Sequence, residues 1–183
     1  YFESPLNPNL KLVDIGQLRA RVDRINAKRD EDEKIVLIID NTFATPFCQR
    51  PIALGVDMVV HSLTKDVGGF GTDMGGIVMA AEKFHNPLLL FRKDFGAVLS
   101  PKNAWPILVY GLPTLGLRMK QQQVTALKVA KFLEAHPKIE KVYYPGLSSF
   151  PQFALAKKQM TDFDGHFAPG SMIYFVLKGN RGH

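Results

Sequence analysis

The feature that most constrains this sequence is a lysine that stands between an apolar run and a glycine-rich loop. Residues 58–60 are Met-Val-Val, and the hydroxyl residues Ser62 and Thr64 follow them. Lys65 comes next, and residues 68–76 contain five glycines. A lysine at a strand end can bind a carbonyl group as a Schiff base, while nearby hydroxyls and amides hold an anion. The pattern therefore suggests pyridoxal phosphate (PLP), and the alternative is a loop lysine in water.

A carboxylate follows a second apolar run. Residues 35–39 are Ile-Val-Leu-Ile-Ile, a length and composition typical of a buried strand in a parallel sheet. Asp40 follows directly, and a carboxylate there is costly unless it has a cationic or hydrogen-bonding partner. The alternative interpretation is a local turn with Asn41.

The two apolar runs are expected to be neighbouring parallel strands. Between them, residues 51–55 predict one helical turn with proline near its start and glycine after its end. The connection is long enough for a crossover between parallel strands. Asp40 and residues 62–65 would then share the carboxyl edge of an open α/β sheet, which is where ligands bind.

The glycines after Lys65 do not match a nucleotide-binding loop. Such a loop has Gly-x-Gly-x-x-Gly before a helix, or it ends in Gly-Lys-Ser/Thr. Here the lysine precedes the glycines, and an apolar run at 77–80 follows them. We therefore expect the loop to return the chain antiparallel to the preceding strand.

The rest of the chain alternates helical and strand patterns. Asp14 is a good helix N-cap with Gln17 in the capping-box position, and the apolar spacing predicts a helix that ends near Lys28. A helix disturbed by Pro87 is expected at 82–91, irregular helical turns packed around Trp105 at 100–118, and a long helix at 118–135. A strand at 139–144, a helix at 153–160 and a strand at 172–177 are expected to form a βαβ unit. His61 is expected to be a strand-end histidine held by a hydrogen bond.

Composition argues against several classes of protein. The 183 residues carry a formal net charge of +6, but basic and acidic side chains are interleaved at 19–33, which argues against a nucleic-acid partner. No apolar run approaches the length of a membrane span. The single cysteine, Cys48, fits a reducing compartment. The histidines and Cys48 have no zinc-like spacing, and the Gly-x-Ser-x-Gly motif of a hydrolase is missing.

Two motifs at the expected ligand edge carry a family resemblance. Residues 39–46 are Ile-Asp-Asn-Thr-Phe-Ala-Thr-Pro, and residues 61–65 are His-Ser-Leu-Thr-Lys. They closely resemble the Cys/Met-metabolism, or transsulfuration, family of PLP enzymes, which includes cystathionine gamma-synthase, cystathionine gamma-lyase, methionine gamma-lyase and O-acetylhomoserine sulfhydrylase. The resemblance continues at Glu-Ser-Pro-Leu-Asn-Pro (3–8), Ala-Trp (104–105), Gly-Leu-Pro-Thr-Leu (111–115) with Arg118, and Val-Tyr-Tyr-Pro-Gly-Leu (142–147). It covers almost the whole chain.

The resemblance implies a PLP site built from five residues. Lys65 matches the lysine that forms the Schiff base, and Asp40 matches the carboxylate that pairs with the pyridinium nitrogen. Ser62 and Thr64 match the phosphate-binding hydroxyls, and Asn7 matches the amide that faces the phenolic oxygen of the cofactor. An ionised Asp40 would keep the ring nitrogen protonated, and the freed Lys65 amine could move protons as a general base and acid.

The resemblance also implies an α/β fold like that of aspartate aminotransferase, fold type I, with a mostly parallel sheet and an antiparallel strand after the PLP lysine. Residues 1–118 would belong to the large PLP-binding domain, 119–136 would form a linking helix, and 137–183 would begin a smaller, truncated C-terminal α+β domain. The family implies small amino-acid substrates, a cytoplasmic location, and homodimers or homotetramers that share sites between subunits. No nucleic acid, membrane or metal is expected as a partner.

The implied activity is elimination or replacement at the γ carbon of a sulfur-containing or O-acylated amino acid. The alternatives are a β-lyase of the same family and a non-catalytic ligand-binding fragment of the fold. Two positions depart from the family: Asp66 stands where a tyrosine is common, and Tyr110 where an arginine is common. These departures leave open which elimination or replacement is run.

The chain starts at Tyr1 without a methionine, which suggests an internal fragment. The family's ring-stacking tyrosine, its glycine-rich phosphate turn and its carboxylate-binding arginine have no counterpart that can be assigned here. We therefore expect the isolated segment to be catalytically inactive.

Overall fold

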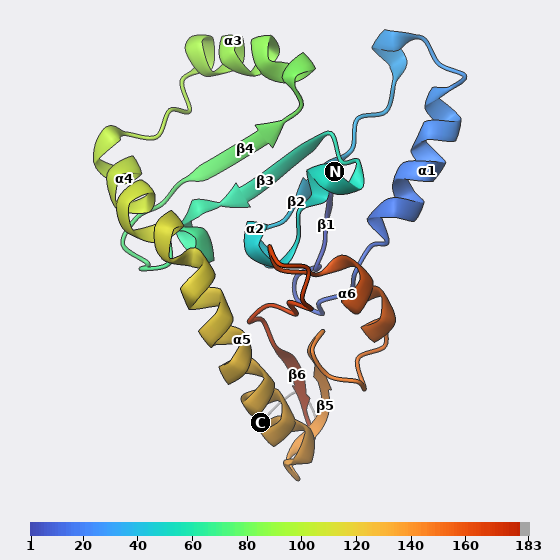
Figure 1. Cartoon of the computed structure of the whole chain (residues 1–183), viewed down its shortest axis with the longest axis vertical. Coiled ribbons are helices and arrows are strands. Elements are labelled where there is room, and N and C mark those ends of the chain that lie inside the picture. The colour runs from blue at the N-terminus through green and yellow to red at the C-terminus, as the bar shows by residue number, and fades with distance from the viewer. Residues whose placement is uncertain (180–183) are drawn as a thin grey trace.

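The computed structural model describes residues 1–179 of the chain. It contains a four-stranded sheet in the order β1-β2-β3-β4 and a separate two-stranded sheet, β5-β6 (Figure 1). The strands of the main sheet are β1 (Phe2–Glu3), β2 (Ile38–Asp40), β3 (Met58–Ser62) and β4 (Gly76–Ala80). Strands β1, β2 and β3 are parallel, and β4 is antiparallel to β3. The α/β class, the mostly parallel sheet and the antiparallel return after the glycines are confirmed.

Strand β2 covers only the end of the apolar run 35–39. The Asn26 side chain binds both main-chain groups of Ile35: Nδ2 donates to Ile35 O at 2.9 Å, and Ile35 N donates to Oδ1 at 2.8 Å. Leu37 N donates to Asp57 Oδ2 at 2.8 Å. Because side chains bind these main-chain groups, the groups are not free to join the sheet ladder. The predicted strand exists, but it is shorter than expected.

Helix α1 (Ile15–Asn26) packs against the main sheet. Asp14 caps it as predicted, since its Oδ1 accepts a hydrogen bond from Gln17 N at 2.9 Å. The Gln17 side chain differs from a capping box, because its Nε2 donates to Asp14 Oδ2 at 2.9 Å. The buried residues that join helix and sheet are Ile15, Val22, Leu37, Ile39, Val56 and Val59.

Three further helices precede α5 in the chain: α2 (Thr45–Cys48) after β2, and α3 (His85–Phe95) and α4 (Pro101–Pro106) after β4. Pro87 lies in the first turn of α3, where no main-chain donor is needed, so the predicted disturbance does not occur. The predicted packing around Trp105 is wrong, because this residue is 63% exposed. The segment instead packs through a small buried cluster of Leu63, Val67 and Ile107.

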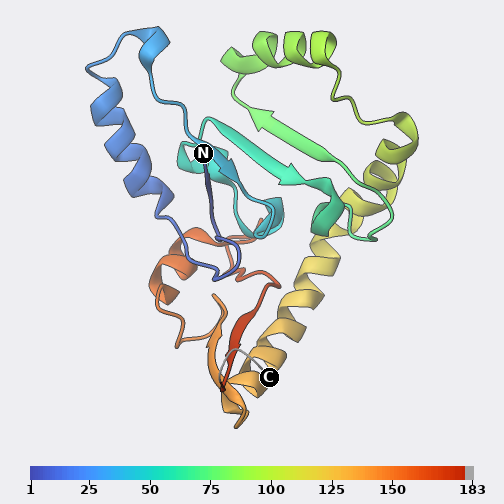
Figure 2. The same ribbon diagram turned by 180° about the vertical axis from the view of Figure 1, so that it is seen from behind.

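The long helix α5 (Leu112–Ala135) runs from the main sheet to the two-stranded sheet (Figure 2). That sheet contains β5 (Ile139–Tyr143) and β6 (Tyr174–Leu177), and α6 (Phe153–Gln159) lies between them in the chain. Neither α5 nor any other helix within residues 1–179 is long and apolar enough to cross a membrane.

Strands β5 and β6 are antiparallel, so the predicted βαβ unit is wrong. Ala156 of α6 and the following Met160 are buried in a cluster with Leu10 and Leu12, and Tyr143 of β5 and Tyr174 of β6 pack against the same cluster. The helix is therefore anchored in a core that it shares with the N-terminal loop, and the chain then returns to β6 beside β5 in the opposite direction. The division into domains at 118 and 136 stays a prediction.

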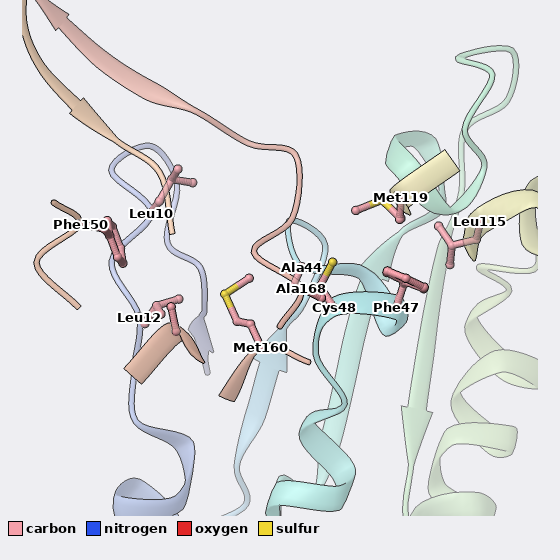
Figure 3. Packing of buried hydrophobic residues seen from close by; sticks show 11 residues of the cluster. Leu10, Leu12, Ala44, Phe47, Cys48, Leu115, Met119, Phe150, Met160 and Ala168 are labelled. Carbon is pink, nitrogen blue, oxygen red and sulfur yellow. The ribbon is translucent and has the colours of Figure 1, made fainter. Parts of the chain in front are cut away.

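One buried cluster joins segments that are far apart in the sequence (Figure 3). It takes residues from the N-terminal loop, α2, α5 and the region of α6: Leu10, Leu12, Ala44, Phe47, Cys48, Leu115, Met119, Phe150, Ala156, Met160 and Ala168. Burial of this many apolar side chains is the main force that holds α5 and α6 beside the main sheet.

Candidate active site

The carboxyl ends of the parallel strands meet at one edge of the main sheet. The register pairs Glu3 with Asp40, and Asp40 with Val60. Asp40 is the last residue of β2, Ser62 is the last of β3, and Asn7 lies in the loop after β1. Because side chains alternate along a strand, Asp40 and Ser62 lie on the same face. The fold therefore brings the residues predicted on two neighbouring strands to one edge.

Asp40 is held by hydrogen bonds at both oxygens. Its Oδ1 accepts Thr42 N at 2.9 Å, and its Oδ2 accepts the Tyr1 hydroxyl at 3.2 Å. The Thr42 hydroxyl accepts Ser62 N at 2.9 Å, which ties the end of β2 to the end of β3. Burial, followed by the charge of Asp40, raises the pKa of Tyr1. The local turn at Asp40 thus exists, with Thr42 as its partner and not Asn41, and the second carboxylate oxygen faces outward to the exposed Tyr1.

Lys65 lies in a single π-helical turn, Leu63–Val67, directly after β3. The turn is kinked at Lys65, whose φ of −94° and ψ of −141° are not helical. The lysine is exposed, and among residues 1–179 its amine has no hydrogen bond or ion pair. Thr64 Oγ1 accepts Gly75 N at 3.3 Å and keeps its own O–H to donate. Ser62 precedes the turn without capping it through its side chain.

The groups at this edge are complementary to PLP. The cofactor has an aldehyde, a phosphate, a phenolic oxygen and a ring nitrogen. The edge offers an exposed amine at Lys65, hydroxyl donors at Ser62 and Thr64, an exposed amide at Asn7 and a carboxylate at Asp40. A carboxylate paired with a protonated ring nitrogen and hydroxyls paired with a phosphate are charge-assisted hydrogen bonds, which are the stronger kind. The residues present fit the cofactor.

His61 lies on the opposite face of β3, and the prediction that a hydrogen bond holds it is wrong. The residue is 1% exposed, and neither ring nitrogen has a hydrogen-bond partner among the described residues. The alternation of side chains turns it away from the polar edge and into the core. Burial lowers the pKa of His61 to about 4, against the opposing charge of Asp40. The ring is therefore neutral near pH 7.

A network of buried amides lies on the same face as His61. Asn41 Nδ2 donates to Gln49 O at 2.9 Å and to Thr45 O at 3.2 Å. Gln49 Nε2 donates to Asn41 Oδ1 at 2.8 Å. Gln159 of α6 donates from its Nε2 to Gln49 Oε1 at 2.9 Å. This network ties α6 to the end of β2 and uses the hydrogen-bonding groups of Asn41 internally.

Two contributors to the Asp40 edge were not predicted: Tyr1 and Thr42. Thr42 could have been found from its position, because an Asp commonly accepts a hydrogen bond from the main chain two residues later. No local pattern marks Tyr1. Its contact depends on the pairing of β1 with β2, and β1 was not predicted as a strand.

A second polar cluster, which the sequence did not predict, lies in the turn after α6. Potential metal-ligand atoms of Asp162, Asp164 and His166 lie within 4.8 Å of one another. Zinc-like spacing rules do not find mixed carboxylate and imidazole clusters of this kind. Asp162 Oδ1 already accepts Asp164 N at 2.9 Å and His166 N at 2.8 Å, and these bonds account for the turn.

The mostly parallel α/β sheet, with an exposed lysine and a carboxylate at its carboxyl edge, defines the class of fold-type-I PLP proteins. Comparison with known families supports this class. The family model described as "Cys/Met metabolism PLP-dependent enzyme" matches residues 1–182. The chain therefore belongs to this family, whose cofactor is PLP, and the resemblance found in its motifs is confirmed.

Similar proteins are named as lyases and synthases of sulfur amino acids. The chain is 44% identical over 181 residues to the L-methionine gamma-lyase of Fusobacterium nucleatum subsp. nucleatum, covering 98% of this chain and 42% of the relative. It is 43% identical over 180 residues to a probable cystathionine gamma-synthase of Herpetosiphon aurantiacus, covering 98% and 52%. It is 42% identical over 178 residues to the cystathionine beta-lyase of Lactococcus lactis subsp. cremoris, covering 97% and 43%.

A solved structure is also similar. The apo form of CalE6, a methionine gamma lyase from Micromonospora echinospora, matches with a TM-score of 0.86 and 32% sequence identity, covering 98% of this chain and 45% of that chain. The chain thus spans between 42% and 52% of the length of these relatives.

Proposed function

We propose that this chain provides the cofactor-binding part of an enzyme that uses PLP for elimination or replacement at the γ carbon of a sulfur-containing or O-acylated amino acid. The observation that carries the proposal is that Asp40 ends β2 while Lys65 lies in the turn directly after β3, the parallel neighbour of β2. Relatives named as methionine gamma-lyase and cystathionine gamma-synthase support the choice of the γ carbon.

In this proposal each residue at the edge has one task. Asp40 balances the positive charge of the pyridinium nitrogen, and Ser62 and Thr64 donate to the phosphate. Asn7 donates its amide to the phenolic oxygen. Lys65 would hold the cofactor through its amine, and the freed amine would move protons at the substrate Cα as a general base and acid. When bound, PLP supplies an electron sink for the charge that develops at Cα.

A β-lyase is the nearest rival, because the chain is 42% identical to a cystathionine beta-lyase and 44% identical to a methionine gamma-lyase. These values are too close to separate the two reactions. A non-catalytic PLP-binding or ligand-binding protein is the rival from another class. Asp66 and Tyr110 would contribute to the choice of reaction.

The wider organisation is part of the same proposal. Residues 1–118 would belong to the large domain, 119–136 would link it to the next, and 137–183 would open a C-terminal domain. The protein would act in the cytoplasm as a homodimer or homotetramer with sites shared between subunits. The buried, unpaired Cys48 agrees with a reducing compartment.

The test is a substrate panel on the full-length protein with added PLP. Cystathionine, methionine, cysteine and acylated homoserines are each supplied, and keto acid, ammonia and thiol are measured. We expect γ-elimination or γ-replacement products that disappear in Lys65→Ala and persist in Lys11→Ala, which changes an exposed lysine elsewhere. Products of β-elimination alone would favour the β-lyase, and bound PLP without turnover would favour the binding protein.

A further inference from the structure

The turn that carries Lys65 is joined to the start of α5 by the side chain of Arg118. Arg118 Nη1 donates to Asp66 O at 2.7 Å, and Nη2 donates to Gly111 O at 2.8 Å. Nε donates to Thr114 Oγ1 at 3.0 Å. All three guanidinium nitrogens therefore have an acceptor, and one acceptor is the main-chain carbonyl of the residue directly after Lys65.

The end of the Lys65 turn also lies close to Gly111, the residue before α5, and Gly69, just after the turn, lies close to Arg118 of α5. A Cβ on Gly111 would lie 2.6 Å from Val67 O and 2.7 Å from Gly68 O. A Cβ on Gly69 would lie 2.4 Å from the guanidinium carbon of Arg118. Only residues without a Cβ permit this approach, so the guanidinium fits tightly into the junction.

The turn spans only five residues, Leu63–Val67. Main-chain hydrogen bonds close its end, from Gly68 N to Leu63 O at 3.0 Å and from Gly69 N to Lys65 O at 2.8 Å. Because a single helical turn is marginally stable by itself, contacts from outside decide whether it holds its shape. Leu63 and Val67 supply apolar contact, Gly75 N donates to Thr64 Oγ1 on one side of Lys65, and Arg118 donates to Asp66 O on the other.

The charge of Arg118 also acts on the carboxyl group of Asp66, the residue that departs from the family pattern. Burial raises the pKa of Asp66, while the nearby charge of Arg118 and the Gln122 side chain lower it. The arginine thus compensates a half-buried negative charge beside Lys65. A lysine at this position would carry the same charge, but its single ammonium could not reach acceptors in three directions as the planar guanidinium does.

We propose that Arg118 is a positioning residue for Lys65: it fixes the turn that carries the lysine by binding the main-chain carbonyls of Asp66 and Gly111. This role rests on the proposed PLP function, because it places the amine that would bind the cofactor. Arg118 itself does not contact the reacting atoms in this role.

The test compares Arg118→Ala and Arg118→Lys with Arg50→Ala in the full-length protein. Arg50 is a matched control, because its guanidinium also binds main-chain carbonyls, those of Thr161 and Asp162, but it does not touch the Lys65 turn. The first readout is amide hydrogen exchange of residues 63–69 without cofactor. The second is the rate at which PLP becomes attached to Lys65 in a borohydride-reducible form, and the third is the split between kcat and KM.

We expect amide hydrogens of residues 63–69 to lose protection from exchange in both Arg118 variants. In Arg50→Ala they should keep this protection, even where its thermal stability falls by the same amount as that of the Arg118 variants. PLP attachment and kcat should fall by about 10- to 100-fold in Arg118→Ala, with less than about a threefold change in KM, as for a group displaced by roughly 1 Å. Arg118→Lys should recover part of this loss. If Arg118→Ala does not fold, Arg118→Lys and Thr114→Val, which removes the acceptor of Nε, carry the same test.

Unchanged protection and attachment in the Arg118 variants would overturn the proposal, and so would equal losses in Arg50→Ala. The failure of the proposed function is a separate result. If the wild-type protein never attaches PLP, the proposed function falls, and hydrogen exchange at residues 63–69 still decides whether Arg118 holds the turn.

Discussion

Asp40 and Asn41 are neighbours in the sequence, yet they lie on opposite faces of the sheet and differ in their surroundings. Asp40 is half-buried, and one of its oxygens is bound only by the exposed hydroxyl of Tyr1. Asn41 is fully buried, and its amide is bound to Thr45 and Gln49. The first face keeps polar groups available to a ligand, whereas the second uses them to join parts of the chain.

This contrast provides a criterion that distinguishes a ligand-binding group from a structural one. Both faces carry polar side chains at a strand end, so residue type alone does not distinguish them. The distinguishing property is whether the hydrogen-bonding capacity of a group is used within the protein. Lys65, Ser62 and Asp40 retain capacity, and the Asn41 network does not.

The largest expected effect is that of Asn41→Asp on stability. The substitution replaces a buried donor by a carboxylate that faces the carbonyls of Thr45 and Gln49, so an unpaired charge is buried. We expect a loss of about 3–5 kcal/mol in the free energy of unfolding, measured by denaturant titration. Asn86→Asp, on the exposed surface of α3, should change it by less than about 0.5 kcal/mol. Similar values for both variants would contradict the structural role of Asn41.

An effect of pH on stability, of nearly the same size, is expected from His61. This residue lies on the same face of the sheet as Asn41, and neither of its ring nitrogens has a hydrogen-bond partner among residues 1–179. Burial lowers its pKa from 6.5 to about 4, so the unfolded chain binds a proton more readily than the folded one. Stability is therefore fully present above pH 6.5 and is lost as the pH falls towards 4.

The contribution of His61 over this range is about 3 kcal/mol. Between pH 6.5 and pH 4, the free energy of unfolding should fall by about 3 kcal/mol less in His61→Leu than in the wild type. Denaturant titrations at each pH measure this difference. His85→Leu, at an exposed position, should keep the wild-type dependence. An unchanged dependence in His61→Leu would mean that the buried ring does not control it.

Asp40→Asn should affect the cofactor and not the fold. The asparagine oxygen can still accept Thr42 N, but the charge that is proposed to pair with the ring nitrogen is lost. Because a hydrogen bond to a charged group contributes about 1.5–3 kcal/mol, we expect PLP affinity to fall by about 10- to 100-fold. Equilibrium titration with PLP measures this, with the exposed Asp32→Asn as the control. A large loss of stability with unchanged affinity would place Asp40 among the structural groups.

The smallest effects are expected from two glycines of the loop after Lys65. Both Gly69 and Gly71 have positive φ, at 81° and 68°, so alanine costs about 1 kcal/mol at either position. Gly69→Ala should cost roughly twice as much as Gly71→Ala, since its Cβ would meet Arg118 while Gly71 has nothing within 4 Å. Thermal unfolding of the two variants gives the comparison. Equal losses would mean that the junction with Arg118 is not tight.

Much of this fold could be predicted from local patterns. The apolar run before Asp40, the N-cap at Asp14 and the lysine followed by glycines each reflect a rule that acts within a few residues. The predictions that failed depend on long-range packing. The segment between the antiparallel strands β5 and β6 is buried in one cluster with Leu10 and Leu12, and no property of α6 itself indicates that partner.

The candidate site shows the same limit. Asp40 and Lys65 could be proposed from their positions at strand ends, and Thr42 from its spacing to Asp40. The lack of hydrogen-bond partners for the His61 ring and the contact of Tyr1 with Asp40 could not be predicted. Each depends on which strands pair and on which face of the sheet a side chain lies. Arg118 belongs to a motif that the sequence shows, but its hydrogen bond to Asp66 O joins residues 52 positions apart.

The central claim is that Lys65 is the residue that binds PLP at the edge marked by Asp40. The most direct measurement is peptide mapping by mass spectrometry after the protein has been incubated with PLP and reduced with borohydride. We expect the reduced adduct on the peptide that contains Lys65, at about one per chain. An adduct spread over exposed lysines such as Lys11 and Lys83, with Lys65 unmodified, would contradict it.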